Sequence, residues 1–110
     1  MQMTPVHTDA VLKSFVETVI PILRERLAPS KVLIFGSRAR GEAGKDSDID
    51  VIIVSEAFRG TRFVKRMSTV LKMVNFPRHV DFICYTSEEF ERMKGSSIVV
   101  KAAVGEGIAV

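Results

Sequence analysis

The sequence is poor in the residues that mark disulfide-rich or membrane proteins. It has no tryptophan and a single cysteine, Cys84. One cysteine excludes an internal disulfide and a cysteine-ligated zinc site, so we interpret Cys84, in the apolar stretch 82–85, as a small core residue. The longest apolar run is too short to cross a bilayer. No secretory signal pattern follows Met1, and we therefore expect a cytoplasmic protein with no membrane partner.

Neither sign of charge dominates the chain. The 16 Lys and Arg residues exceed the 13 Asp and Glu residues by a net charge of +3. That excess is too small to identify a nucleic-acid binder, although it is compatible with a site for polyanionic phosphates. The length of 110 residues and the 46% hydrophobic content predict one domain over residues 1–110 with one core. The same hydrophobic content leaves open a homodimer with a hidden apolar face.

Apolar spacing in the first half of the chain predicts a helix followed by two strands. Thr8 or Asp9 can cap the helix, and Pro21 should kink or divide it. Its apolar positions are Val11, Leu12, Phe15, Val16, Val19 and Leu23. The strand 31–35 is stopped by Gly36, and a polar segment, 42–47, leads into the strand 48–54.

The second half of the chain predicts a loop over 55–60, an amphipathic helix over 61–74 and a strand over 79–85. The expected core positions of that helix are Phe63, Val64, Met67, Val70, Leu71 and Val74, with Met73 also filling the core. Thr86 and Glu89 form a capping-box pattern for a helix to Lys94. A last helix from Ser96 or Ser97 to Val104 and a strand over 108–110 complete the chain. The fold class is α/β (α+β), with one small mixed sheet of about four strands flanked by helices.

Asp48 and Asp50 are the first candidate catalytic residues. Side chains alternate along a strand, so both carboxylates project the same way, about 6–7 Å apart at two residue rises. Mg²⁺ binds through one or two carboxylates plus substrate phosphates. Two metals about 3.5–4 Å apart can hold the attacking and leaving oxygens of an in-line phosphoryl displacement. The pair is thus typical of a metal site for phosphate chemistry, although Asp-x-Asp alone could simply end a loop.

The segment after the first strand can bind phosphate. Gly36 lets the backbone come close to a ligand, and amide groups at the start of an expected short helix favour an anion. The hydroxyl of Ser37 can donate to a phosphate oxygen, while Arg38 and Arg40 can add charge-assisted contacts. Taken alone, the glycine and serine are a common turn and the arginines are ordinary surface charges.

Asp81 is the third candidate carboxylate, between Val80 and Phe82 in an apolar strand. Burial of a carboxylate without a partner is costly. A shared metal would supply the partner if this strand neighbours the one that begins at Asp48, whereas Arg78 would supply it in a purely structural arrangement. The strand, the Gly-Ser turn, the carboxylate pair and the third carboxylate together indicate a phosphate-handling metal site far more strongly than any one of them.

These residues resemble the minimal nucleotidyltransferases of the DNA polymerase beta superfamily, whose pattern is Gly-Ser, ten residues, then Asp-x-Asp. The similarity covers the chain from about Lys31 to Tyr85, and the ending 102–110 also resembles the last helix and strand of the family. The matching residues are Gly36-Ser37-Arg38-Ala39-Arg40-Gly41, Ser47-Asp48-Ile49-Asp50-Val51 and Asp81.

The resemblance implies the nucleotidyltransferase fold and a role for each of these residues. Asp48 and Asp50 would be ligands of two Mg²⁺ ions, with Mn²⁺ as an alternative. Asp81 would bind one metal and help to deprotonate the acceptor hydroxyl. Gly36 and Ser37 would hold the triphosphate of ATP, and Arg40 or Arg38 would neutralise its charge. The expected reaction transfers a nucleoside monophosphate, AMP from ATP, to an acceptor hydroxyl.

The resemblance also suggests a protein partner. Many relatives pair with a separate helical HEPN toxin protein, and some act as antitoxins by adenylylating it. The main alternative is a binding module that keeps the fold and neutralises its partner by occlusion with little turnover. A third hypothesis, nucleic-acid binding through Arg59, Arg62, Lys65 and Arg66, is not favoured, because Phe63 is the one aromatic residue among these charges and its helical spacing assigns it to the core. We interpret those four residues as a solvated helix face near the triphosphate site.

Overall fold

The computed structural model describes residues 9–42 and 48–110. Its centre is a four-stranded sheet in the order β3-β2-β1-β4. The strands are β1 (Lys31–Phe35), β2 (Ile49–Val54), β3 (Val80–Tyr85) and β4 (Ile108–Ala109). β1 runs antiparallel to both β2 and β4, whereas β2 and β3 are parallel. The predicted mixed sheet of about four strands is therefore confirmed.

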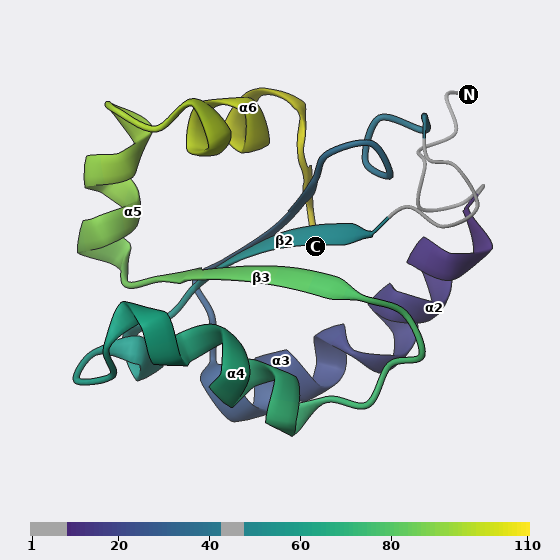
Figure 1. Ribbon diagram of the computed structural model, residues 1–110, viewed down its shortest axis with the longest axis horizontal. Helices are drawn as coiled ribbons and strands as arrows, with labels where there is room; N and C mark the ends of the chain where they lie inside the picture. Colours follow the sequence, from purple (N-terminus) through teal and green to yellow (C-terminus); the bar gives the residue numbers. More distant parts are fainter. Residues whose placement is uncertain (1–8, 43–47) are drawn as a thin grey trace.

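Helices cover both faces of the sheet (Figure 1). One face packs against α2 (Ala10–Thr18), α3 (Ile20–Leu27) and α4 (Phe63–Met73), and the other against α5 (Ser87–Lys94) and α6 (Ile98–Glu106). The alternation of strand side chains divides the apolar residues between two clusters, instead of the one core that we expected. In β2, for example, Val51 and Ile53 belong to the cluster under α2, α3 and α4, whereas Ile52 and Val54 belong to the cluster under α5 and α6.

The predicted division of the first helix is confirmed. α2 ends at Thr18, and Pro21 lies in the first turn of α3, where a missing N–H costs least. Asp9 is the N-cap of α2, because its Oδ1 accepts hydrogen bonds from the amides of Val11 and Leu12 at 3.0 and 3.1 Å. Thr8, the alternative cap, lies outside the described residues.

Several element boundaries differ from those predicted. β2 and β3 each begin one residue later, at Ile49 and Val80. The predicted loop over 55–60 contains a 3-10 turn, η1 (Glu56–Phe58), because the hydroxyl of Ser55 accepts a hydrogen bond from the amide of Ala57 and caps it. α6 continues past Gly105 to Glu106. The capping box of Thr86 and Glu89 at α5 is confirmed.

The predicted core face of α4 is partly wrong. Phe63, Val64, Met67 and Leu71 are exposed, and Val70 and Arg66 are the buried residues of the helix. The arginine turns inward because it has three acceptors there: the backbone oxygens of Thr61 and Cys84 and the carboxylate of Glu89. Met73 packs against the core, as predicted.

Cys84 is a core residue, as predicted. Its side chain is buried, and burial raises the pKa of its thiol to about 12. None of the helices that the structure describes is long and apolar enough to cross a bilayer.

Candidate active site

Three predicted aspartates lie at the end of the sheet where β1 finishes and β2 and β3 begin. Asp50 is paired in register with Asp81 of β3 on one side and with Phe35 of β1 on the other. Because side chains alternate along a strand, Asp50 lies on the same face of the sheet as Ile52, which packs under α5 and α6. Asp48, two residues earlier, immediately precedes the strand. Parallel pairing of β2 with β3 thus brings carboxylates from two distant segments together.

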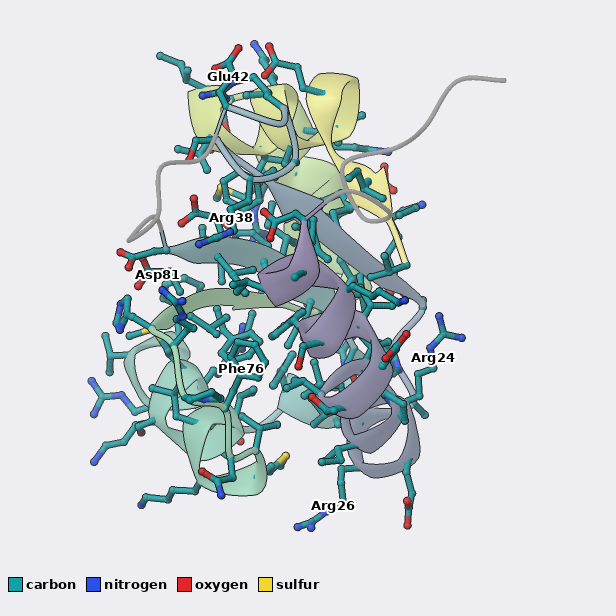
Figure 2. The ribbon with its side chains drawn as sticks, turned by 90° about the vertical axis from the view of Figure 1, so that its right-hand side faces the viewer. Arg24, Arg26, Arg38, Glu42, Phe76 and Asp81 are labelled. Atoms are coloured by element: carbon teal, nitrogen blue, oxygen red, sulfur yellow. The ribbon has the colours of Figure 1, made fainter. Side chains whose placement is uncertain are left out.

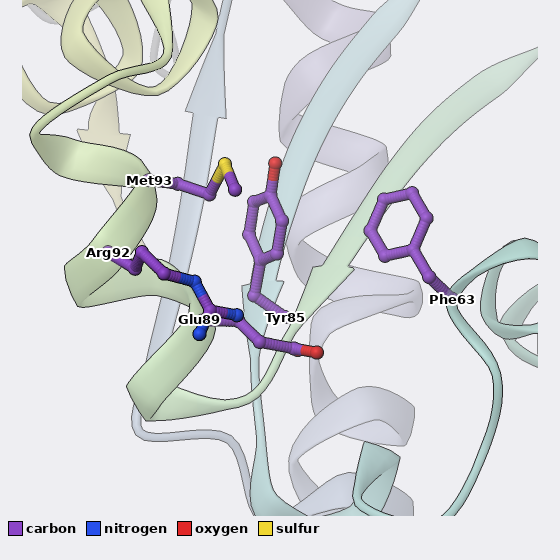
Figure 3. A pocket seen from close by; sticks show the side chains of 5 residues that line it. All are labelled: Phe63, Tyr85, Glu89, Arg92 and Met93. Atoms are coloured by element: carbon purple, nitrogen blue, oxygen red, sulfur yellow. The ribbon is translucent and has the colours of Figure 1, made fainter.

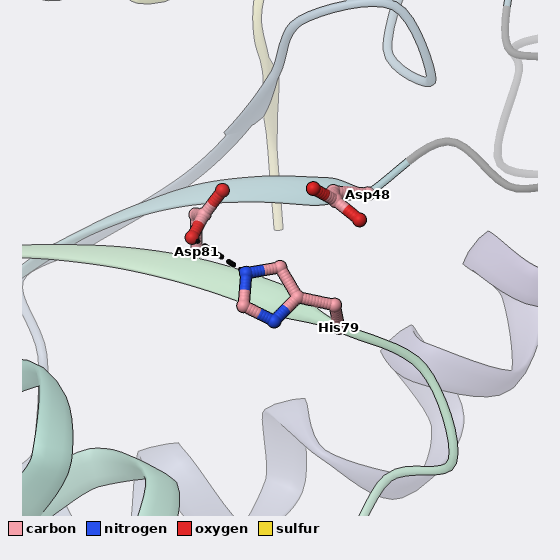
Figure 4. Close-up of side chains that lie close together, drawn as sticks. All are labelled: Asp48, His79 and Asp81. Carbon is pink, nitrogen blue, oxygen red and sulfur yellow. Dashed lines mark hydrogen bonds and ion pairs between the residues drawn. The ribbon is translucent and has the colours of Figure 1, made fainter.

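Asp48, His79 and Asp81 form a cluster of possible metal-donor groups at this end (Figure 4). One donor atom from each residue lies within 4.8 Å of the others. The Nε2 atom of His79 and the Oδ1 atom of Asp81 are 2.9 Å apart, at hydrogen-bond distance. The side chain of Asp81 is 46% exposed, so this carboxylate is not buried in the strand as its neighbours in the sequence suggested. The three groups form an open, accessible site rather than a buried ion pair.

Asp50 lies beside this cluster and faces the turn after β1. A Cβ atom placed on Gly36 would overlap its Oδ2 atom, which shows how close the carboxylate comes to the glycine backbone. Partial burial, and then the negative charges of Asp81 and Asp48, raise the pKa of Asp50 above its usual value. The site therefore concentrates negative charge, and a cation bound there would relieve it.

The segment from Gly36 to Gly41 is a set of hydrogen-bonded turns, and the short helix predicted there is wrong. Gly36 has a φ of +80°, a left-handed conformation that diverts the chain directly after β1. The amides of Arg40 and Glu42 donate to the carbonyls of Gly36 and Ser37 at 3.2 and 2.9 Å. These bonds span four and five residues, so they close a compact loop instead of propagating a helix. Residues 43–47, the rest of the predicted spacer, lie outside the described residues.

The two predicted phosphate-binding arginines have different environments. Arg38 is 4% exposed, and its Nη1 atom contacts Asp9 Oδ2 at 2.7 Å. Partial burial opposes ionisation of Asp9, but hydrogen bonds from the Leu12 amide and from Arg38 lower the pKa of that carboxyl below its usual value. Arg38 thus connects the turn to the start of α2. Arg40 has a side chain that is 41% exposed, hydrogen-bonded to Glu42 at 3.0 Å and 3.6 Å from Glu106.

Figure 2 looks onto this end of the sheet and labels Arg38 and Glu42 of the turn and Asp81 of β3. Arg38 and Asp81 lie on the same side of the molecule, with Glu42 of the turn above them. Asp50 links the turn after β1 to the first residues of β2 and β3, because it lies against Gly36 and pairs in register with Asp81.

The model of the nucleotidyltransferase domain family matches residues 16–107 of the chain. The chain belongs to this family. A Methanocaldococcus jannaschii protein, provisionally named a protein adenylyltransferase, is 39% identical over 44 residues, which are 40% of this chain and 42% of that protein. The match thus spans less than half of the relative. Family membership indicates nucleotidyl transfer as the chemistry of the domain, in agreement with the resemblance carried by the Gly-Ser and Asp-x-Asp residues.

Solved structures support the fold of this nucleotidyltransferase domain. A protein from Sulfolobus solfataricus, provisionally described as a nucleotidyltransferase, superposes with a TM-score of 0.65 at 21% identity and covers 99% of this chain and 87% of that one. BolA1 from Arabidopsis thaliana superposes with a TM-score of 0.52 at 22% identity. The match covers 64% of this chain and 89% of BolA1. At these identities the similarity concerns the fold alone.

His79 is the site residue that the sequence pattern does not single out. Apolar periodicity marks it only as the start of a strand, although it precedes Asp81 by two residues and side-chain alternation places both on one face. The available signal is therefore the His-x-Asp spacing. A histidine beside a predicted metal-binding carboxylate is a candidate ligand or hydrogen-bond partner for it.

The basic residues at the start of α4 do not adjoin this site. Arg66 is 5% exposed and donates to the Cys84 carbonyl at 3.1 Å, so it lies at the end of β3 remote from Asp81. The prediction of a solvated face holds for Arg59, Arg62 and Lys65, which are exposed, and is wrong for Arg66. A separate pocket lies at this end of β3 (Figure 3). It is lined by Phe63, Tyr85, Glu89, Arg92 and Met93.

Proposed function

We propose that this nucleotidyltransferase moves AMP from ATP to an acceptor hydroxyl and that Asp48, Asp50 and Asp81 form its metal-dependent centre. The observation that carries the proposal is the register of β2 and β3, which places Asp50 beside Asp81. A carboxylate oxygen of Asp48 also lies within 4.8 Å of one of Asp81. Partial burial, and then the negative charges of Asp81 and Asp48, raise the pKa of Asp50, which supports a site that binds cations.

The donor set suits divalent ions. Carboxylate oxygens are the ligands that Mg²⁺ prefers in proteins, and the open face leaves room for water and phosphate oxygens to complete the coordination. Mn²⁺ would suit the same set. When bound, such ions neutralise charge on the triphosphate and stabilise the attacking and leaving oxygens of the displacement. We propose Asp48 and Asp50 as ligands of both ions and Asp81 as a ligand of one.

The turn after β1 is proposed to hold the triphosphate. Gly36 has no side chain and brings its backbone next to Asp50, so phosphate and metal ligands would share one small space. Ser37 would donate its hydroxyl to a phosphate oxygen. Of the two arginines, Arg40 is better placed to reach phosphate because its side chain is 41% exposed. The pairing of Arg38 with Asp9 favours a role in positioning the turn.

The chemical step is an in-line displacement at the α-phosphorus of ATP. The acceptor oxygen forms a new bond to that phosphorus, and the bond from the phosphorus to the oxygen bridging to the β-phosphate breaks. Pyrophosphate leaves with the electron pair of the broken bond. The hydroxyl proton passes to the carboxylate of Asp81, which is 46% exposed and so is accessible to an incoming acceptor.

A protein is the acceptor class that we propose. The support is the Methanocaldococcus jannaschii relative named a protein adenylyltransferase, whose matched segment covers 42% of its length. A HEPN-type helical toxin is the partner that the minimal nucleotidyltransferase resemblance suggests, with modification as the antitoxin mechanism. The alternative is neutralisation of the partner by occlusion alone.

Mass spectrometry of a partner encoded beside this protein separates the two functions. The partner, incubated with this protein, ATP and Mg²⁺, should gain one AMP. Asp81→Asn should abolish that gain, whereas Glu91→Gln, on an exposed part of α5, should leave it intact. Neutralisation at full potency by a variant lacking all three aspartates, with no AMP added by the wild type, would favour occlusion.

A further inference from the structure

His79 contributes a nitrogen donor to a site that sequence patterns describe through carboxylates alone. We infer that His79 binds metal directly and that it makes this centre favour a first-row transition ion, such as Mn²⁺ or Co²⁺, over Mg²⁺. The inference rests on the proposed function, because it concerns the same metal centre. It goes further by naming an additional ligand and the class of ion that the ligand selects.

The geometry places the imidazole among the other donors. Donor atoms of Asp48, His79 and Asp81 lie mutually within 4.8 Å. Ligands about 2.1 Å from one six-coordinate ion lie about 3–4.2 Å from each other, so small side-chain rotations complete the set. Figure 4 shows the ring of His79 directed at Asp81 and into the space that Asp48 also faces. The Nε2 atom of His79 is 2.9 Å from Asp81 Oδ1, so the ring already faces the site, and a bound ion would replace the hydrogen bond between them.

The side chain of His79 contributes little to the stability of the fold. It is 59% exposed, so the ring fills no core space. The backbone of the same residue does contribute to the fold, because its carbonyl accepts a hydrogen bond from the amide of Ile49 at 3.3 Å. That bond joins the beginnings of the two strands and would persist after substitution of the side chain. The ring can therefore be replaced without loss of the β2–β3 pairing.

Ligand chemistry then sets the metal preference. Mg²⁺ takes oxygen ligands in a near-ideal octahedron and retains several waters. Imidazole binds first-row transition ions more readily, in the increasing order Mn²⁺, Fe²⁺, Co²⁺, Ni²⁺. Two carboxylates alone would suit Mg²⁺ and Mn²⁺ alike. Adding one imidazole to Asp48 and Asp81 shifts the balance toward the transition ions.

Electron spin echo spectroscopy of bound Mn²⁺ tests direct coordination. The protein, freed of any polyhistidine tag, is loaded with Mn²⁺ and inorganic triphosphate, a probe that contains no nitrogen. We expect ¹⁴N modulation characteristic of a coordinated imidazole. His79→Asn should remove it, and His7→Gln, which replaces the only other histidine of the chain, should retain it. Binding titrations should show Mn²⁺ affinity falling about tenfold or more in His79→Asn, with little change for Mg²⁺.

The outcomes distinguish this inference from the proposed function. Suppose that the wild type binds Mn²⁺ and Mg²⁺ without imidazole modulation and that His79→Asn binds each ion as tightly as the wild type does. This result would overturn the assignment of His79 and leave the carboxylate centre standing. Failure of the wild type to bind either ion in the presence of triphosphate would overturn the metal centre itself. A tenfold loss of Mn²⁺ affinity with the modulation retained would also overturn direct coordination, because His79 would then act only through Asp81.

Discussion

The carboxylate of Asp50 lies over the backbone of Gly36, at the place where a side chain on that glycine would have to stand. Gly36 is the first residue after β1, and Asp50 is the second residue of the neighbouring strand. The left-handed φ of +80° at Gly36 and the absence of a Cβ atom are thus two separate requirements for glycine. The first concerns the path of the chain, and the second concerns the position of a candidate metal ligand.

These two requirements can be separated by substitution. Gly36→Ala should lower stability by about 1–2 kcal/mol because of the left-handed backbone, and it should also displace Asp50 and abolish AMP transfer. Gly60→Ala is the matched control, because Gly60 has a φ of +89° and a Cβ atom added there would meet nothing within 4 Å. It should show a similar loss of melting temperature with transfer unchanged. Normal triphosphate and metal binding by Gly36→Ala would refute the steric requirement.

Ser37→Ala should weaken nucleotide binding without weakening the fold. Loss of one hydrogen bond to a charged oxygen costs about 1.5–3 kcal/mol, so transfer efficiency should fall about ten- to a hundredfold. Ser68→Ala removes a comparable hydroxyl from α4, where it donates only to the carbonyl of Lys65, and should leave affinity unaltered. Melting temperature and ATP affinity are measured on the same samples. A lower melting temperature of Ser37→Ala with unchanged affinity would show that the serine supports the turn and not the phosphate.

Arg38→Gln should primarily destabilise the domain. The guanidinium is buried against Asp9, and removing one partner of a buried ion pair costs up to about 3–5 kcal/mol. Arg40→Gln, at a half-exposed position, should change the free energy of unfolding by less than about 1 kcal/mol while reducing transfer. Denaturant unfolding and transfer assays on both variants test this division. Equal loss of stability in the two variants would contradict it.

The fold was largely predictable from the sequence because its strands have local signals. The apolar run 31–35 stops at Gly36, and β1 has the same bounds. The proline at position 21 and the capping box at Thr86 mark helix boundaries by backbone chemistry that needs no tertiary partner. The three aspartates come together because alternation along the strands and parallel pairing of β2 with β3 are also simple rules.

Other features depend on contacts that the local sequence does not contain. Arg66 is buried because Glu89 and the Cys84 carbonyl, both distant in the chain, receive its hydrogen bonds, and no apolar spacing rule anticipates a buried arginine. The position of Arg38 likewise depends on Asp9, 29 residues away. His79 escapes prediction because it precedes its strand, where periodicity carries little information. The pattern of apolar residues thus does not predict polar contacts between residues that are distant in the chain.

The ion pair of Glu89 with Arg66 predicts a specific dependence of stability on pH. The hydrogen bond from Arg66, together with bonds from Thr86, lowers the pKa of Glu89 from 4.5 to about 2. A carboxyl whose pKa is lower in the folded state stabilises the fold above its unfolded pKa, and this contribution disappears as the pH falls through the folded pKa. The contribution of Glu89 should therefore be complete above about pH 5 and should decline toward pH 2.

Glu89→Gln tests this dependence, since glutamine can keep the capping box with Thr86 but cannot ionise. At pH 7 the variant should be less stable than the wild type by about 1.5–3 kcal/mol, the typical value of a hydrogen bond to a charged group. The difference in the free energy of unfolding, measured with urea, should shrink steadily between pH 5 and pH 3. Glu91→Gln, which breaks an exposed pair with Lys94 on the same helix, should differ from the wild type by less than about 1 kcal/mol throughout. A Glu89→Gln difference that stays constant across this range would show that the partner of Arg66 acts by packing and not by charge.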